Sequence, residues 1–236
     1  RARTGPGSGH GKLYARCARH RCERDSPPCR LLVTAPLGTR VPAAQLAGLL
    51  ALSGASALLC EVIWMRRLAL VLGSTGLAIT LTLSAYMAGL GIGGVWAGRQ
   101  TWRRAPMGYG ILELVAALWA LGFPFLLGGL SAAVDGRWAV LLLIPPGLIH
   151  GATLPAVAAG VRQARGVAGL YAANTGGAVL GVLFGTFVLL PALGVRGAEL
   201  LAALGSAVAG LGALWLSWEH RVSGLGSRVA SAAPAP

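Results

Sequence analysis

The sequence predicts an all-α, polytopic membrane protein in which about six transmembrane helices form a bundle. Hydrophobic residues make up 55% of its 236 residues, charged residues only 11%, and the mean hydropathy is +0.68. A soluble domain usually carries about 25% charged residues, so lipid is needed to cover the excess apolar surface. Six apolar runs are each long enough to cross a hydrocarbon core about 30 Å thick. A lipid bilayer is therefore the first partner that the sequence predicts.

Residues 1–42 precede these runs and contain no long apolar stretch. They hold nine of the 20 Lys and Arg residues, and we interpret them as a basic, disordered N-terminal segment. They lack the apolar core and small-residue cleavage site of a secretory signal peptide. Cys17, His20, Cys22 and Cys29 are the residue types of a zinc site, but their spacing does not match paired CxxC motifs. We therefore expect neither metal nor cofactor, with zinc bound by these four residues as the alternative.

The apolar runs are followed by a tail over 218–236 that we expect to be disordered. Short connections between the runs predict antiparallel neighbouring helices. Of the 20 basic residues, 16 fall on the side of the N-terminus in this arrangement and four on the other side. The positive-inside rule then places both termini in the cytoplasm, in a multi-pass protein of the cell inner (plasma) membrane. The same distribution argues against a nucleic-acid partner. The predicted runs are 43–64, 73–97, 109–130, 139–160, 169–192 and 198–217.

The first run contains an acid, Glu61, and Arg66 and Arg67 lie in the turn that we expect after it. Charge in hydrocarbon is costly, so an acid in such a run has a protein partner or lies near the interface. Three interpretations stay open for Glu61: a structural pair with Arg66 or Arg67, a cation or proton site, or an interfacial residue without a role. The third run contains a second acid, Glu113, on the opposite side of the membrane in this topology, so we expect no direct pair between the two acids.

Glycines of the second and fifth runs recur every four residues and therefore share one helical face in each run. Small residues allow membrane helices to approach closely, so these faces are expected to pack against neighbours. The alternative is a lining that leaves room for a substrate. The glycines concerned are Gly89 and Gly93 in the second run and Gly177, Gly181 and Gly185 in the fifth.

The fourth run, LLLIPPGLIHGATLPAVAAG, is rich in proline and glycine. Proline removes a backbone donor, so we expect this helix to be kinked or broken near its middle, beside His150 and Thr153. Broken helices often build the binding sites of transporters, so these two residues are either structural or part of a polar site. In the fifth run, Asn174 and Thr175 can hydrogen-bond to another helix, and a link from Asn174 to the fourth run is plausible.

Several phrases together resemble the membrane domain of bacterial spermidine synthase-like proteins, the multi-pass relatives described as fused major-facilitator and spermidine synthase proteins. They are SGASALLCEVIWMRRLALVLGST, YMAGLGIGG, GATLP and GLYAANTGGAVLGVLFGTFVLLPALGVRG. Glu61, Trp64 and Arg66 match an ExxWxR pattern, and the phrase with Asn174 and Thr175 leads to Pro191, Gly194 and Gly197. The similarity covers about residues 43–217.

The resemblance implies a partner domain that transfers an aminopropyl group to putrescine in polyamine biosynthesis. The chain itself stops at Pro236, and no Gly-rich loop follows a strand, so we expect catalysis to need a module outside this sequence. The first hypothesis is therefore a membrane domain that anchors or serves such an aminopropyltransferase. The alternatives are a small transporter or channel for a cationic metabolite such as a polyamine, and a structural subunit bound to other membrane subunits. Whether the chain is an enzyme stays open.

Overall fold

The computed structural model describes residues 43–73, 75–133, 136–161 and 164–232. Helix makes up 94% of this part of the chain, which contains no strand, so the all-α prediction is confirmed. The predicted disordered segment 1–42 lies outside the described residues, as does the alternative zinc site of Cys17, His20, Cys22 and Cys29.

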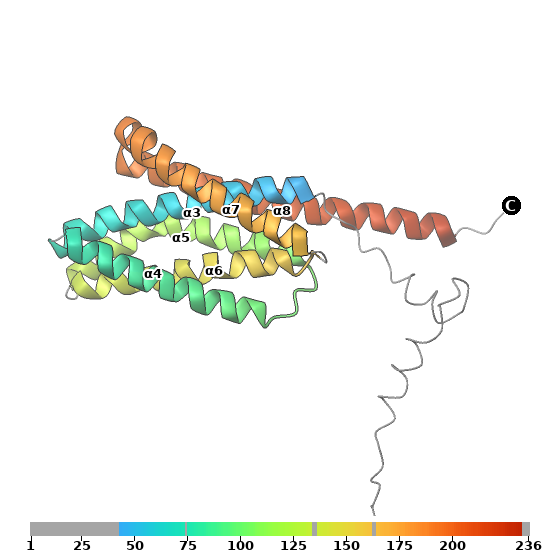
Figure 1. Ribbon diagram of the computed structural model, residues 1–236, viewed down its shortest axis with the longest axis horizontal. Helices are drawn as coiled ribbons and strands as arrows, with labels where there is room; N and C mark the ends of the chain where they lie inside the picture. The colour runs from blue at the N-terminus through green and yellow to red at the C-terminus, as the bar shows by residue number, and fades with distance from the viewer. Residues whose placement is uncertain (1–42, 74, 134–135, 162–163, 233–236) are drawn as a thin grey trace, which may run out of the picture. The chain divides into compact units, whose positions relative to one another are not determined.

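Long helices follow one another with short connections (Figure 1). They are α3 (Ala43–Leu72), α4 (Thr75–Gly98), α5 (Ala105–Ala133), the 3₁₀ helix η1 (Gly136–Leu143), α6 (Ile144–Ala158), α7 (Ala164–Phe184), the π-helical turn η2 (Gly185–Leu189) and α8 (Leu190–Ala232). Five helical stretches in the described residues are long and apolar enough to cross a membrane: Ala44–Leu72, Gly76–Gly98, Ala105–Leu130, Trp138–Ala158 and Arg165–Glu219.

Helix α3 is two turns longer than the sequence predicts, and Arg66 and Arg67 lie within it rather than in a turn. Arginine and leucine favour the helix, so nothing in the local sequence stops it before glycine. The chain leaves the helix at Gly73, whose φ of 67° is the left-handed conformation common just after a helix. The Gly73 amide donates to the carbonyl of Ala69 at 3.1 Å, which closes the last turn.

The break expected in the fourth run lies earlier than predicted, where η1 ends and α6 begins. Pro145 and Pro146 occupy the first turn of α6, where proline is tolerated because those amides have no intrahelical acceptor. Pro155 lies inside the helix without ending it. His150 and Thr153 therefore lie in continuous α-helix, and the prediction that they border a mid-helix break is wrong.

The last two predicted runs belong to one continuous helical stretch, which changes direction at Gly194. Gly194 has φ 69° and ψ 179°, a backbone conformation that residues with a side chain rarely adopt. Beyond this bend α8 continues to Ala232, so most of the segment predicted as a disordered C-terminal tail is helical instead.

Two helix pairs pack through glycine. Helix α4 lies along α6, where a side chain at Gly89 would come within 2.7 Å of the Ile144 carbonyl oxygen and one at Gly93 would overlap the backbone of Leu148. Helix α7 lies along α3, where side chains at Gly177 and Gly181 would overlap the backbones of Ala51 and Ala55, and one at Gly185 would overlap the Leu59 side chain. These contacts bring the helix backbones together.

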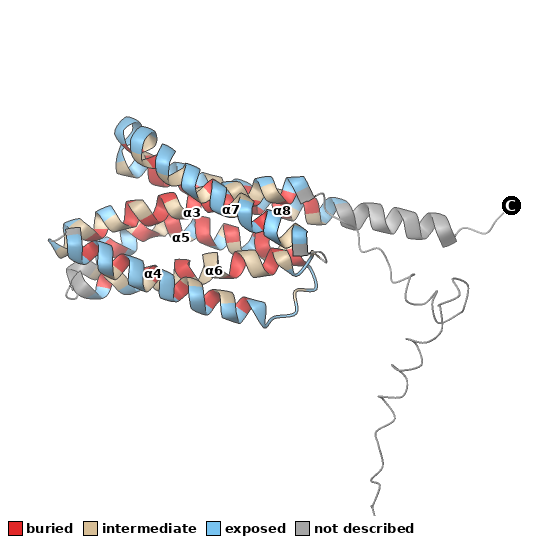
Figure 2. Cartoon of the chain, in the orientation of Figure 1, coloured by how far each residue is buried: buried red, intermediate tan, exposed pale blue. Residues whose placement is uncertain are grey.

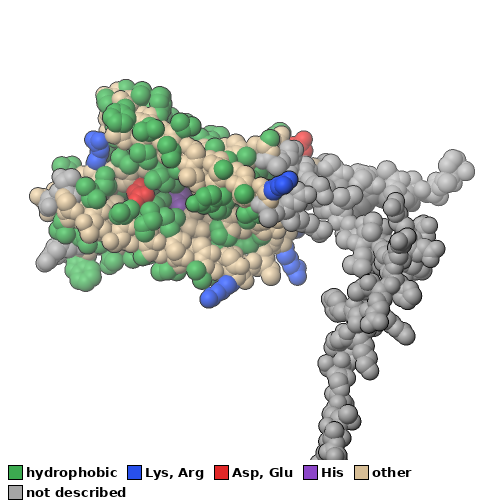
Figure 3. All heavy atoms as spheres, in the orientation of Figure 1, with side chains coloured by type: hydrophobic (Ala, Val, Ile, Leu, Met, Phe, Trp, Pro, Cys, Tyr) green, Lys and Arg blue, Asp and Glu red, His purple; other side chains and the backbone are tan. Residues whose placement is uncertain are grey.

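Buried residues lie on the inward sides of the helices (Figure 2). The Trp64 and Phe123 rings stack at 4.9 Å in the larger core cluster. The outward surface is also apolar: Leu70 is 86% exposed and Phe187 74%. Figure 3 shows hydrophobic side chains spread over this face, with few charged ones between them. Such a surface suits hydrocarbon and not water.

Candidate functional site

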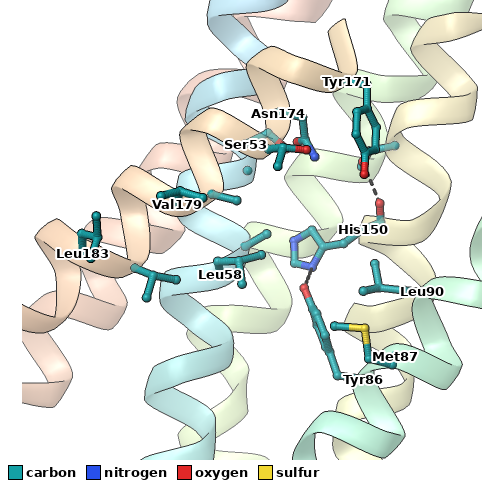
Figure 4. Close-up of a pocket in the computed structure, with 16 residues that line it drawn as sticks. Ser53, Leu58, Tyr86, Met87, Leu90, His150, Tyr171, Asn174, Val179 and Leu183 are labelled. Atoms are coloured by element: carbon teal, nitrogen blue, oxygen red, sulfur yellow. Dashed lines mark hydrogen bonds between the residues drawn. The ribbon is translucent and has the colours of Figure 1, made fainter. Parts of the chain in front are cut away.

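A cleft of about 600 Å³ opens where α7 diverges from the pair formed by α4 and α6. Most of its lining is apolar, and its polar side chains come from four helices (Figure 4). They are Ser53 from α3, Tyr86 from α4, His150 and Thr153 from α6, and Tyr171, Asn174 and Thr175 from α7. We refer to this space and its lining residues as the cleft.

His150 lies at the centre of the polar part of the cleft. The Tyr86 hydroxyl hydrogen-bonds to its Nδ1 at 2.8 Å, and the two ring centroids lie 6.0 Å apart. Its other nitrogen, Nε2, is buried and makes no hydrogen bond within the described part of the chain. Figure 4 shows Tyr86 on one side of the imidazole and Ser53 and Asn174 on the other. Burying a polar nitrogen without a partner is costly, so a hydrogen-bonding ligand that reached Nε2 from the cleft would remove that cost.

Thr153 supports this arrangement from the next turn of α6. Its hydroxyl donates to the His150 carbonyl oxygen at 2.7 Å, which satisfies the hydroxyl locally. Thr153 is 4% exposed, and it lines the cleft at the same level as His150. Its main effect is on the geometry of this helical turn.

Asn174 is placed by the close contact between α3 and α7. A side chain at Gly54 would overlap the Asn174 carbonyl oxygen and come within 3.0 Å of its Oδ1. The link that we expected from Asn174 to the fourth run is not formed by a hydrogen bond in the described residues. Asn174 instead lies against α3 and shares the cleft with His150.

Of the three interpretations left open for Glu61, the ion pair with Arg66 or Arg67 is not formed by the residues that the structure describes. Arg67 instead pairs with Glu199 of α8 at 2.5 Å, across 132 residues of sequence. Arg66 is exposed. Arg67 lies on the side of α3 that faces α8. Glu199, although distant in sequence, is therefore its ion-pair partner, and Glu61 is not.

Glu61 is 8% exposed, and its Oε2 is buried without a hydrogen bond from the described residues. It interacts electrostatically with Tyr86, whose hydroxyl holds His150. Glu61 does not line the cleft itself but lies one turn along α3 from Leu58, which does. It is therefore an acid without an ion-pair partner in the described residues, within one turn of the cleft.

Glu113 is completely buried, and the Ser53 hydroxyl donates to its Oε1 at 2.5 Å. The Trp64 indole lies beside Glu199 and the Ser206 hydroxyl beside Glu113, so polar groups continue along the interface of α3 with α5 and α8. Glu61 and Glu113 form no direct contact with each other that the structure records.

Two residues were not identified from the sequence: Ser53, which hydrogen-bonds to Glu113, and Tyr86, which hydrogen-bonds to His150. A signal for Ser53 was present, because Ser53, Ser56, Cys60, Trp64 and Arg67 recur at spacings of three and four and so share one face of α3. Tyr86 carried no such signal, since its partner His150 lies 64 residues away.

The described residues contain no group of three or more His, Cys, Asp or Glu side chains that could hold a metal ion. The cleft is instead a site for hydrogen bonding and for contact with apolar groups. Comparisons with protein families, with curated proteins and with solved structures found no match to this chain.

Proposed function

We propose that the chain is a membrane domain of six passes that binds a small organic cation, a polyamine or a similar amine, in the cleft and carries it across the bilayer. The observation that carries the proposal is the cleft itself. It combines an apolar lining with hydrogen-bonding groups and an unpartnered His150 nitrogen at membrane depth. Polar groups at that depth are costly, so they usually mark a substrate path.

The helical stretch Arg165–Glu219 supports the sixth pass. Its 55 residues would extend about 80 Å as one helix, more than twice the thickness of the hydrocarbon core. The bend at Gly194 divides it into α7 with η2 and the remainder of α8, and both α7 and α8 lie along α3. Six passes put both termini on one side, which the basic residues favour as the cytoplasmic side of the plasma membrane.

The chemistry of the lining supports an amine as ligand. Among the residues that the structure describes, no Lys or Arg lines the cleft, whereas hydroxyl, amide and imidazole groups do. An ammonium group donates hydrogen bonds to such acceptors. An ionised Glu61 carboxylate, which acts electrostatically on Tyr86, would also attract it. The apolar remainder of the lining suits the methylene chain of a diamine. A volume of about 600 Å³ is within the usual range for a small-ligand pocket.

The resemblance to the membrane domain of spermidine synthase-like proteins supports an association of this chain with an aminopropyltransferase module. Some of the residues that carry the resemblance lie on or near the cleft: Asn174 and Thr175 line it, and Glu61 acts on Tyr86. In that association the domain would serve the aminopropyltransferase module by passing it the amine. The test is co-expression with such a module, where retention of the two on an affinity column would support the association.

The function is tested by equilibrium binding of radiolabelled putrescine to the full chain in nanodiscs, and by its uptake into proteoliposomes. Glu61→Gln and His150→Ala are expected to weaken binding about tenfold, since each removes a charged or hydrogen-bonded partner. Glu219→Gln is the matched control, because Glu219 is an exposed acid of α8 that does not line the cleft. Absence of saturable binding, or equal binding by Glu61→Gln and the unaltered chain, would refute the proposal.

A further inference from the structure

Ser53 faces two environments at once. It lines the cleft, yet it is only 2% exposed, and its hydroxyl donates to the buried carboxylate of Glu113 on α5. Its backbone is fixed because the next residue, Gly54, lies against the backbone of Asn174. Ser53 is therefore a single side chain between the cleft and Glu113.

Glu113 has no cationic partner in the part of the chain that the structure describes. Its titratable neighbours are Cys60 on α3, Tyr86 on α4 and Tyr109 on its own helix, none of which carries positive charge. On α8, the acid that also acts on Cys60 is Glu199, and Arg67 already pairs with it. From α6, the titratable group is His150, which Tyr86 holds at the cleft.

The remaining contacts of Glu113 are few. Ser206 of α8, which does not line the cleft, lies beside the carboxylate, and Oε2 accepts no hydrogen bond from the described residues. Tyr109 lies near both Ser53 and Glu113, but its own hydroxyl donates to the Leu49 carbonyl oxygen at 3.1 Å. A carboxyl group buried with one hydrogen bond and no cation is expected to hold a proton when the cleft is empty.

We propose that Glu113 is an exchangeable proton site which Ser53 connects to the cleft, so that a cation entering the cleft displaces one proton. The inference rests on the proposed function and adds the ion that is exchanged. A positive ligand beside Ser53 lies one side chain from Glu113 and favours the carboxylate there. The proton that leaves offsets one positive charge of the entering ligand, which reduces the net charge added to the buried region.

The proton path requires only Ser53 and water. During protonation the Ser53 hydroxyl proton moves to Oε1 of Glu113, and a hydronium ion in the cleft replaces it on Oγ. One O–H bond breaks and one forms at Oγ, the hydronium ion becomes water, and the serine is regenerated. The hydrogen bond in the structure, in which Oγ donates to Oε1, is the arrangement that precedes this step; after it, the protonated Oε1 donates to Oγ. Release after ligand entry is the same sequence in reverse.

The test measures protons released for each putrescine bound, with a pH-indicator dye in weakly buffered nanodisc solution after rapid mixing at saturating ligand. The unaltered chain is expected to release about one proton per bound putrescine. Glu113→Gln is expected to bind putrescine without this release, because glutamine has no exchangeable carboxyl proton. Ser53→Ala is expected to slow release at least about tenfold. Ser206→Ala is the matched control, since it removes a hydroxyl beside the same carboxylate but not from the cleft.

Each outcome decides the inference. Putrescine binding without proton release by the unaltered chain would overturn the proton site and leave the cleft function standing. Absence of putrescine binding would overturn both. Equal slowing by Ser53→Ala and Ser206→Ala would overturn the path through Ser53. Infrared difference spectra of the unaltered chain avoid reliance on variants: loss of a protonated carboxyl band on adding putrescine supports the site, and an unchanged band overturns it.

Discussion

Replacing Arg67 by methionine tests the buried ion pair that joins α3 to α8. Glu199 is 3% exposed and the Arg67 side chain 21%, so the substitution leaves a carboxylate in the core without the guanidinium 2.5 Å away. Breaking a buried pair by removing one partner typically costs 3–5 kcal/mol. Arg196, one turn before Glu199 on α8, keeps some positive potential nearby, so we expect the lower end, about 3 kcal/mol.

The assay is reversible unfolding in mixed micelles, followed by tryptophan fluorescence, because Trp64 lies beside Glu199. The double variant Arg67→Met with Glu199→Gln is expected to be more stable than Arg67→Met alone, since the neutral amide no longer needs a cation. Arg66→Met is the matched control: Arg66 is exposed, and its loss is expected to change the free energy of unfolding by at most about 0.5 kcal/mol. Effects of the two core substitutions that simply add, within about 0.5 kcal/mol, would refute the pairing.

Three further substitutions test the helix contacts and the cleft. Gly177→Leu is expected to abolish stable assembly of α7 on α3, because the leucine side chain would overlap the Ala51 backbone. Gly176 is exposed and has open space around it, so the control variant Gly176→Leu should elute normally in size-exclusion chromatography. Gly194→Ala is expected to lower stability by about 1–2 kcal/mol through its positive φ, while Gly48→Ala, which meets no neighbouring atom, should not; equal unfolding curves would contradict this. Tyr86→Phe is expected to shift the ¹⁵N resonance of His150 Nδ1 and to cost about 1 kcal/mol, and an unchanged resonance would exclude the hydrogen bond.

The helical class was predictable because it depends on local composition. An apolar run of about 20 residues can form few structures other than a helix in lipid. Each backbone N–H and C=O group must find its hydrogen-bond partner within the protein there, and a helix provides these partners within the run itself. The ends of the helices were harder to predict. Arg66 and Arg67 looked like a turn because charge is unfavourable in hydrocarbon, but Glu199, 132 residues away, gives Arg67 a buried partner. Only the tertiary structure supplies that partner.

Three of the seven residues predicted for a polar membrane site line the cleft, whereas Glu61, Arg66, Arg67 and Glu113 do not. His150, Thr153 and Asn174 stood out as polar groups in apolar runs, and all three line the cleft. The reason given for His150 was wrong, because the prolines lie in the first turn of α6 and the helix is continuous around it. The residue that positions the imidazole is Tyr86, from a different helix.

The position of the cleft follows from the two glycine contacts. Glycine lets α4 approach α6, and glycine lets α7 approach α3, so each pair is closer than helices with larger side chains at the contact. Helix α7 has few contacts with α6, because its small-residue face is already used against α3. The residues that line the space between the two pairs include Ser53, His150 and Asn174. A mostly apolar cleft that holds a few polar groups beside a buried acid is thus a consequence of how the small residues distribute the helix contacts. A change in those glycines should alter the cleft without touching a polar group in it.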